Sequence, residues 1–426
     1  MIILCFFFFS KTLSYLNFPF ETKEENIELK ESNFFDKHFY NNIQIQLNIG
    51  NPHQTIPFSL MISEYPLVIT SKKANLDSLI LYDQNNSKSY NKLDDNPLIN
   101  WSQIYVYCYF SNDIFSLAIN SKEKKEKEEK FNFFLSTEMS LKLSGILGLS
   151  ISSVRKDLNE YGFIYQLRNK KLIESRSFFI KYNEKNKNIG ELIIGKYPHE
   201  IYPKEFKENK FKFTRSYINS YKESFTFNFD VVYYNNELIQ ERAVSSLEIE
   251  KNFIQGTAEF GVLITKNFFS KYVDLNLCKE VKFKLIFYSY ICDKNIDLSD
   301  FGVLKFILKD ANFSFVFEAN DVFYEMNNEL YFMIFYSKLS GNSWSFGKIF
   351  FQKYLIVFDQ ERKIIGFYER NHDNIIIKPF LIILVICALI IFNIFLIRYF
   401  SNSRFRKKRA NELIDDNYEY LPEKII

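Results

Sequence analysis

Short runs in which apolar and polar residues alternate recur between the two apolar ends of the chain. Examples are NIQIQLNIG (42–50), SQIYVYCYF (102–110), FKFTRSYI (211–218) and ELYFMIFY (329–336). A period of two sends successive side chains to opposite faces of a β-strand. Strong helical patterns are few and short, and the best of them is SVRKDLNEYGFIYQLRNKKLI (153–173). The pattern therefore predicts a mostly β fold in which antiparallel strands dominate.

The size and composition of the chain limit what it can be. Its 426 residues suffice for two domains of ordinary size, and the 47% of hydrophobic residues suffice for substantial cores. The formal net charge is only +3, so nucleic acid is not an expected partner. The one dense charge run, KEKKEKEEK (122–130), is interpreted as an exposed loop.

The N-terminus carries an unbroken apolar run, Ile2 to Phe9, that is too short to span a bilayer. It suits the hydrophobic region of a secretory signal peptide over residues 1–14, although the usual positive segment is missing. The alternative is a buried strand at the N-terminus of the mature protein. Residues 15–38 are interpreted as an N-terminal extension or a short propeptide.

A longer apolar run, Phe380 to Ile397, has 18 residues of which only Asn393 is polar. At about 1.5 Å per residue, such a helix nearly crosses a hydrocarbon core of about 30 Å. Six cations follow directly, and positive charge marks the cytoplasmic side of a membrane. These cations disfavour the alternative of a buried core helix. We expect a linker (369–379), a transmembrane helix (380–397) and a cytoplasmic tail (398–426).

This arrangement predicts a single-pass type I membrane protein of the secretory pathway or cell surface, with its body luminal or extracellular. In that oxidising compartment we expect Cys278 and Cys292, which bracket a hairpin-like apolar stretch, to form a disulfide. Cys108 is expected to be a buried free thiol. No Cys and His cluster has metal-ligand spacing, so no metal or cofactor is expected. Three Asn-x-Ser sequons are candidate glycosylation sites: Asn85, Asn100 and Asn312.

Four motifs carry a resemblance to a known family. They are IQLNIGNPHQ (45–54), SGILGLS (144–150), GELIIGKY (190–197) and NSWSFGKIFFQKYLIVFDQERKIIGFY (342–368). In this order they resemble motifs of the pepsin-like aspartic peptidases, over about residues 39–368. The resemblance implies a bilobal double β-barrel with a central cleft, here an N-terminal β lobe (39–196) and a C-terminal β lobe (197–368). It also implies a C-lobe disulfide at the positions of Cys278 and Cys292.

In this family each lobe supplies one Asp from an Asp-Thr/Ser-Gly-Ser/Thr loop. The two carboxylates share a proton and hold one water, with one acting as base and the other as acid. An ungapped alignment of the first lobe puts the first Asp on Met61, followed by Ile62, Ser63 and Glu64. Met has no proton to exchange, and Ser63 brings a Cβ where the family has glycine.

The second loop departs from the family as well. Matching the apolar residues that follow it puts the second Asp on Glu248 and the Thr-Gly-Thr positions on Ile249, Glu250 and Lys251. Glu keeps a carboxylate but is one methylene longer, and the glycine and hydroxyls are gone. A shifted register would place Ser246 or Glu250 there instead, and no register yields an Asp.

The hairpin flap of the family corresponds to WSQIYVYCYFSNDIFSL (101–117). The flap Tyr becomes Trp101, and two flap glycines become Ser102 and Ile104. The resemblance therefore implies a flap that is stiffer and more apolar than one that opens and closes. A glycan on Asn100 would crowd the mouth of the cleft.

Three hypotheses follow from these departures. The favoured one is a catalytically inactive, monomeric pseudopeptidase that binds a peptide or protein partner through cleft and flap residues: Ile62, Ser63, Glu64, Trp101, Ile249 and Glu250. The second is an active aspartic-type endopeptidase that uses Glu248 with a displaced acid such as Glu64. The third is a structural domain whose cleft is filled by an apolar plug of Met61, Ile62, Trp101, Ile104 and Ile249.

Overall fold

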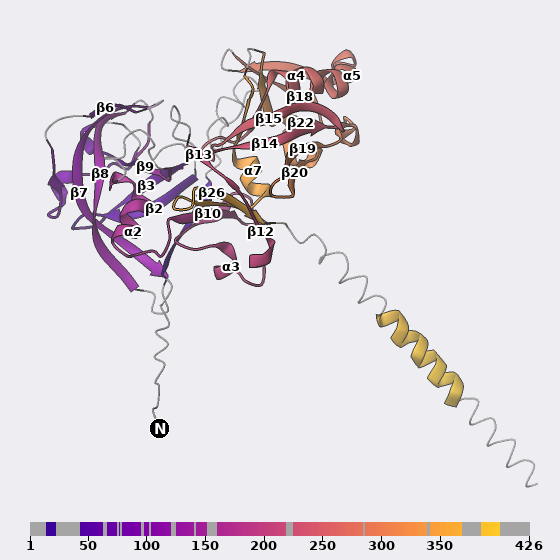
Figure 1. Cartoon of the computed structure of the whole chain (residues 1–426), viewed down its shortest axis with the longest axis horizontal. Coiled ribbons are helices and arrows are strands. Elements are labelled where there is room, and N and C mark those ends of the chain that lie inside the picture. The colour runs from indigo at the N-terminus through magenta and orange to yellow at the C-terminus, as the bar shows by residue number, and fades with distance from the viewer. Residues whose placement is uncertain are drawn as a thin grey trace, which may run out of the picture. The chain divides into compact units, whose positions relative to one another are not determined.

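The computed structural model describes most of the chain. The described residues are 14–22, 43–62, 66–74, 76, 79–94, 98–101, 104–120, 125–139, 142–150, 160–218, 225–283, 286–338, 341–368 and 385–400. The chain divides into two compact units, Met1–Glu369 and Arg370–Ile426. The first unit contains two β-sheets and short helices, and in the second unit residues 385–400 form a helix (Figure 1).

The first sheet has 14 strands among the described residues. In spatial order they are β12 (Phe211–Arg215), β26 (Ile364–Tyr368), β25 (Ile356–Asp359), β10 (Ser177–Tyr182), β11 (Ile189–Ile194), β1 (Tyr15–Thr22), β2 (Ile43–Ile49), β3 (Gln54–Met61), β9 (Gly145–Gly148), β4 (Leu67–Thr70), β8 (Lys125–Met139), β7 (Ile104–Asn120) and β5 (Asn91–Lys92), with β6 (Leu98–Trp101) paired to β7. All but three of these strands belong to the N-terminal half of the chain. This sheet therefore forms the body of the first lobe.

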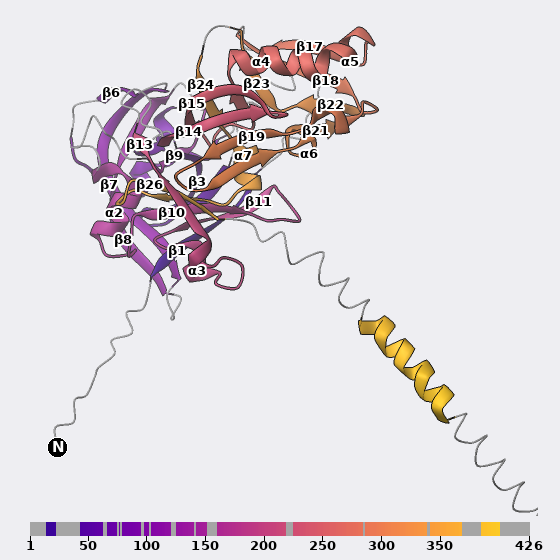
Figure 2. The same cartoon turned by 45° about the vertical axis from the view of Figure 1, so that its right-hand side comes forward.

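The second sheet has 12 strands in the described part of the chain. Their order is β20 (Phe313–Phe317), β19 (Leu304–Leu308), β14 (Phe225–Tyr234), β15 (Glu237–Leu247), β24 (Ser343–Phe346), β16 (Ile254–Gly256), β23 (Ile334–Ser337), β18 (Phe287–Asp293), β22 (Glu329–Phe332) and β21 (Phe323–Met326), with β13 (Tyr217–Ile218) on β14 and β17 (Cys278–Phe283) on β18. Every strand of this sheet comes from the C-terminal half. The mostly β, bilobal fold predicted from the alternating pattern is thus confirmed (Figure 2).

Helices are short in the first unit. They are α2 (Phe163–Asn169), α3 (Pro198–Ile201), α4 (Ala258–Ile264), α5 (Ser270–Asp274), α6 (Ala319–Val322) and α7 (Lys348–Lys353), with a π-helical turn, η6 (Thr265–Phe269), between α4 and α5. Only the middle of the stretch with helical periodicity becomes a helix, α2, and residues 151–159 lie outside the described residues.

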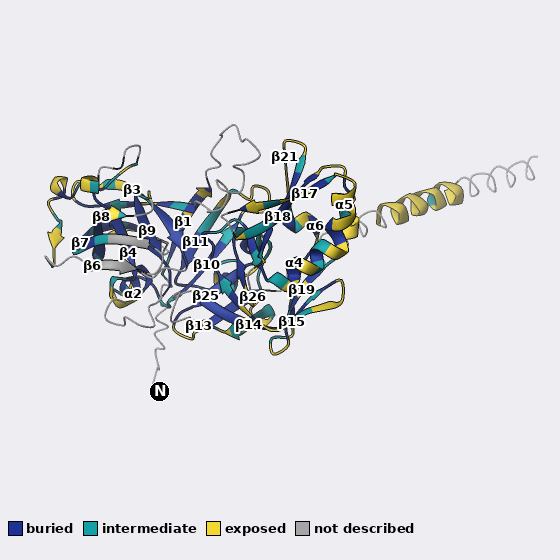
Figure 3. Cartoon of the chain, turned by 90° about the horizontal axis from the view of Figure 1, so that it is seen from above, coloured by how far each residue is buried: buried dark blue, intermediate teal, exposed yellow. Residues whose placement is uncertain are grey.

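The predicted transmembrane segment, 380–397, overlaps the helix at 385–400, while its residues 380–384 lie outside the described residues. The apolar side chains of this helix are exposed, and Figure 3 shows it as an exposed element. Within the described part of the chain, no helix is both long and apolar enough to cross a membrane.

Each sheet contains the same arrangement of three strands. In the first, β9 lies between β3 and β4, parallel to β3 and antiparallel to β4. In the second, β24 lies between β15 and β16, parallel to β15 and antiparallel to β16. The chain therefore repeats one topology in its two lobes, and in each lobe a short loop joins the two outer strands of the three.

One of the sheets continues from lobe to lobe. Strand β10 of the N-terminal half pairs with β25 of the C-terminal half, and the rings of Phe178 and Phe358 stack with centroids 4.6 Å apart. Beside this pair, the buried Gln360 donates from its side-chain nitrogen to the carbonyl oxygen of Leu149 at 2.7 Å. The β10–β25 ladder and these contacts connect the two lobes.

The charge run expected to be a loop belongs largely to a strand instead. Residues 125–130 form the start of β8 and pair with β7, with Lys125 opposite Ile119 and Lys130 opposite Ile114. The backbone hydrogen bonds of this long hairpin outweigh the low strand propensity of Lys and Glu, because tertiary pairing overrides local preference. The side chains of Glu126, Lys127 and Glu128 remain exposed, as expected for a charged segment.

The N-terminal segments predicted before residue 39 are only partly described. Residues 1–13 of the predicted signal peptide lie outside the described residues. Within the predicted extension, β1 pairs with β11 over six residues and buries Leu16, Phe18 and Phe20. This strand is a structural part of the first sheet.

Candidate functional site at the two crossed loops

The register of the sheets places Met61 and Glu248 at equivalent positions of the two lobes. Met61 at the end of β3 lies opposite Gly148, and Leu247 at the end of β15 lies opposite Phe346, the residue before Gly347. Extending the second ladder by one residue puts Glu248 opposite Gly347.

The hydrogen bonds that close the two loops agree with this equivalence. Gly148 donates its N–H to the carbonyl oxygen of Pro66 at 3.1 Å, and Gly347 donates to that of Phe253 at 3.0 Å. Pro66 and Phe253 each lie five residues after the compared position. Gly347 also fills a tight place, because a Cβ there would lie 2.3 Å from the carbonyl oxygen of Lys251.

The first of these positions is apolar. The Met61 side chain is buried, with 8% of the residue exposed, in a cluster with Val68, Cys108, Phe134 and Ile146. Burial raises the pKa of the Cys108 thiol to about 12, so this thiol stays protonated at neutral pH. Nothing in this cluster supplies a carboxylate to polarise a water molecule.

The second position holds an ion pair. One Glu248 carboxylate oxygen accepts a hydrogen bond from the Ser246 hydroxyl at 2.7 Å, and the other lies 2.5 Å from the Lys251 ammonium nitrogen. The side chains of Lys251 and Glu248 are only 14% and 9% exposed. Lys251 also donates to the Ser345 hydroxyl at 3.3 Å. The carboxylate at this position is therefore engaged within its own loop.

The two loops meet across the lobes. The backbone N–H of Ile62 donates to a Glu250 carboxylate oxygen at 3.4 Å, a contact between residues 188 positions apart. Glu250 is buried, and so are Ile62 and Ile249, which both belong to the main hydrophobic core. Glu250 thus occupies the place that the family alignment gives to glycine and uses its side chain to link the lobes.

The other predicted cleft residues are described less fully. Ser63 and Glu64 lie outside the described residues. Trp101 lies in β6 and pairs with Ile104 of β7, so these two strands pair in the region where the flap is expected.

Sequence reasoning assigned no partner to Lys251, which the structure gives to Glu248. The sequence did contain a sign of this ion pair, because Glu248 and Lys251 carry opposite charges and lie three residues apart in one loop. It also missed the contact between Ile62 and Glu250, for which no local signal exists.

A further buried carboxylate, Asp113, lies in the predicted flap region but serves the fold. It accepts hydrogen bonds from the hydroxyl groups of Tyr82, Ser87 (2.7 Å) and Ser89 (2.5 Å) and from the backbone N–H of Ile114 (2.7 Å). Burial and the neighbouring Asp113 carboxylate raise the pKa of Tyr82. With four donors and no exposure, Asp113 is a structural group rather than a second catalytic acid.

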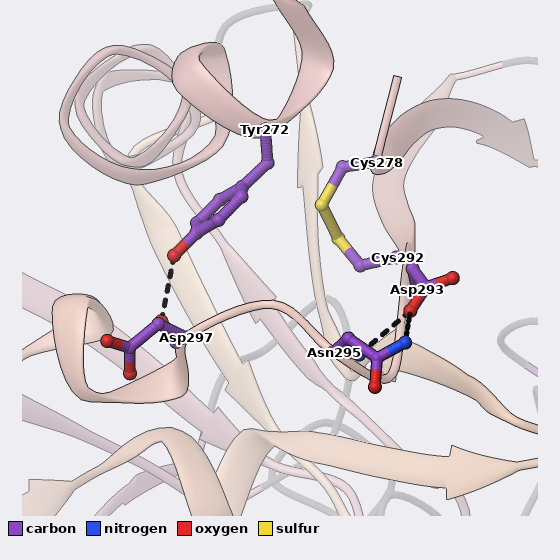
Figure 4. The surroundings of a disulfide bond; sticks show 6 residues. All are labelled: Tyr272, Cys278, Cys292, Asp293, Asn295 and Asp297. Atoms are coloured by element: carbon purple, nitrogen blue, oxygen red, sulfur yellow. Dashed lines mark hydrogen bonds between the residues drawn. A yellow bond between two sulfur atoms is a disulfide. The ribbon is translucent and has the colours of Figure 1, made fainter. Parts of the chain in front are cut away.

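The predicted disulfide between Cys278 and Cys292 is present, directly across the β17–β18 ladder (Figure 4). Beside it, Tyr272 donates to the carbonyl oxygen of Asp297 at 2.9 Å, and Asp293 accepts from Asn295. Cys108 is a free buried thiol, as expected. Among the sequons, Asn85 and Asn312 are exposed, and Asn100 lies in β6. No group of three or more His, Cys, Asp and Glu side chains that could hold a metal ion occurs among the described residues.

The fold has two lobes that repeat one arrangement of three strands, and a loop from each lobe meets the other at the centre. Together with the paired strands β6 and β7, these features are typical of the class of bilobal aspartic peptidase folds. The family model described as eukaryotic aspartyl protease matches residues 45–370. The chain therefore belongs to the eukaryotic aspartyl protease family, as the motifs of the sequence indicated. A comparison with curated proteins finds no match.

Proposed function

We propose that this protein is a catalytically inactive aspartyl protease homologue that binds a peptide or protein partner between its lobes. The observation that carries this proposal is the ion pair between Glu248 and Lys251 at the position equivalent to Met61. Hydrolysis in this family requires two carboxylates that share a proton and hold a water molecule. Here one carboxylate is replaced by a thioether and the other is neutralised by an ammonium group.

The surroundings of the two positions support loss of activity rather than a shifted mechanism. Both carboxylate oxygens of Glu248 are already engaged, one by an ammonium group 2.5 Å away and the other by the Ser246 hydroxyl at 2.7 Å, where a catalytic water would have to bind. On the Met61 side, the described residues of the cluster are apolar or aromatic and include no carboxyl group. In this proposal the first lobe lacks a carboxylate, and the second lobe has one that is held in an ion pair.

The alternative is an active endopeptidase that uses Glu248 with a non-standard second acid such as Glu64. The observation that favours it is that Glu248 and Glu250 are both buried carboxylates in the loop of the second lobe. Burial can tune carboxyl groups toward acid–base roles. The third hypothesis, an apolar plug, is favoured by the burial of Met61, Ile62 and Ile249, and it differs from the first only in excluding a ligand.

The proposed setting is the secretory pathway, with a signal peptide over residues 1–14 and a single anchor at 380–397. Support comes from the apolar N-terminal run, from the exposed apolar side chains of the helix at 385–400 and from the cations behind it. In this setting the body is luminal or extracellular and monomeric, and Asn85, Asn100 and Asn312 carry N-linked glycans.

The test is an incubation of the folded protein with an unbiased peptide mixture at pH 3 to 7, with and without pepstatin, followed by mass spectrometry. We expect no cleavage. Pepstatin-sensitive cleavage that disappears in Glu248→Ala would overturn the proposal and establish an unorthodox carboxylate pair. Enrichment of intact peptides on the immobilised protein would separate partner binding from the plug, with a Trp344→Ala variant as an unfolding control, because Trp344 is fully buried.

A further inference from the structure

Strands β12 and β13, which follow each other in the chain, carry aromatic side chains that the fold does not bury. Phe213 and Arg215 lie two residues apart on β12, so their side chains leave the same face of this strand, and Tyr217 follows at the start of β13 in the second sheet. Phe213 is 48% exposed and Tyr217 is 55% exposed, and Arg215 is also exposed. In the described sheet β12 is an end strand, paired only with β26.

The surroundings of these residues are basic. Residues 203–217 and 361–363 together contain seven Lys or Arg and three Glu. The Arg362 guanidinium lies over the Phe213 ring, 5.6 Å from its centroid. We call Phe213, Arg215, Tyr217 and Arg362 the aromatic–basic face. Aromatic rings with Lys and Arg side chains are the residues enriched where proteins meet the boundary between lipid and water.

This face lies beside the point where the chain leaves the body. Phe211 of β12 pairs with Tyr368, the last described residue of β26. Eleven residues, 369–379, separate Tyr368 from the apolar run at Phe380. Fully extended, a segment of that length spans at most about 40 Å. An anchor that begins at Phe380 would therefore start within about 40 Å of Tyr368 along the chain.

We propose that the aromatic–basic face rests on the bilayer surface, with its cations against lipid phosphate groups and its rings at the interface. The proposal rests on the membrane anchor proposed above. Within the body, Figure 1 shows β12 and α3 toward the lower side and β6 at the upper left. Docking through this face therefore turns the flap-like β6–β7 hairpin, which reaches the Met61 cluster through Cys108, away from the lipid.

The experiment uses the full chain reconstituted in phosphatidylcholine vesicles. Tyr217→Trp reports the aromatic–basic face, and Tyr324→Trp is the matched control, because Tyr324 is 39% exposed on β21, at the end of the second sheet. The probe is quenching of tryptophan fluorescence by lipids brominated close to the headgroup, with the unmodified chain giving the background of Trp101 and Trp344. Alkaline carbonate extraction of the same vesicles tests the anchor separately.

We expect a chain that resists extraction, at least twofold stronger quenching for Tyr217→Trp than background, and no increase for Tyr324→Trp. Adding Phe213→Ser and Arg215→Ser to Tyr217→Trp should lower the quenching while circular dichroism stays unchanged. A retained chain in which Tyr217→Trp is quenched no more than Tyr324→Trp overturns the docking and leaves the anchor standing. A chain released by carbonate overturns the anchor and the docking together.

Discussion

The two lobes share one loop arrangement, but the side chain at the equivalent position is apolar in the first lobe and charged in the second. In the first lobe the position after the central strand holds Met61 among apolar side chains. In the second lobe the equivalent position holds Glu248 in an ion pair with Lys251. Both loops close with the same hydrogen bond from a glycine, Gly148 or Gly347.

This difference separates the features that the fold requires from the side chains that can vary. The strand order and the hydrogen bond from the glycine are kept in both lobes. The side chain at the equivalent position, Met61 or Glu248, differs between the lobes, and in each lobe the neighbouring side chains match its polarity. Stability and catalysis thus depend on different residues of the same loops.

The largest expected effect is that of Met61→Asp, which would make the first lobe polar like the second. An ionised carboxylate without a cation in this cluster should lower the free energy of unfolding by about 4–5 kcal/mol at pH 7. Burial would raise its pKa, so the loss should shrink as the pH falls toward 4. Urea denaturation at both pH values measures this, with Met61→Leu as the control at less than about 1.5 kcal/mol. An unchanged stability would mean that the first loop is solvated and the contrast between the lobes is false.

The covalent contrast between the lobes comes next. The second lobe has a disulfide that closes a loop of 14 residues, whereas Cys108 of the first lobe forms no disulfide. Replacing both Cys278 and Cys292 by Ala should cost about 3 kcal/mol, by the loop-closure estimate for a loop of this size. Denaturation of the double variant measures the loss, and Cys108→Ala serves as the control. A loss equal to that of the control would show that the hairpin is held by packing alone.

A smaller loss is expected from Lys251→Met, which leaves Glu248 without its cation. Because both side chains are slightly exposed, we expect about 2–3 kcal/mol, below the range for fully buried pairs. Glu248→Gln in the same chain should restore most of it, which a double-mutant cycle measures. The matched control is Lys271→Met, from an exposed pair with Asp300, where little change is expected. Equal losses at the two lysines would contradict a buried, structural role for the Glu248 pair.

The smallest change in stability at neutral pH is expected from Cys108→Ala, and this change grows as the pH becomes alkaline. The folded pKa, about 12, lies above the ordinary value of 9.0, so the protonated thiol is favoured in the folded state. Its contribution to stability is complete below pH 9 and is lost as the pH rises from about 9 to 12. Cys108→Ala should therefore flatten the fall of the melting temperature over this range, relative to the unmodified chain. Identical alkaline profiles would show that the thiol is accessible to solvent.

Much of the fold was predictable, because it depends on local patterns. Alternation predicted the strands, and the motifs around Gly148 and Gly347 indicated the two lobes. The Cys278–Cys292 pair followed from the hairpin-like stretch between the two cysteines. The strand at residues 125–130 was missed, because its pairing with β7 depends on a partner that the charge run does not reveal.

The candidate site was predictable in position but not in chemistry. Alignment placed Met61 and Glu248, and it could say which groups were missing. It could not say that Lys251 neutralises Glu248 or that Glu250 reaches the backbone of Ile62 in the other lobe. Both contacts depend on side-chain directions in loops, and the second also depends on how two distant segments are brought together.

The ladder between β10 and β25 has a consequence for how the chain can be divided. A cut in the exposed turn around Pro203 would separate the halves, yet leave Phe178 of one fragment and Phe358 of the other without their stacking partner. Neither fragment alone would be soluble, since each would display an unpaired strand beside bare aromatic rings. Expressed together, the two fragments should therefore reassemble through the β10–β25 ladder.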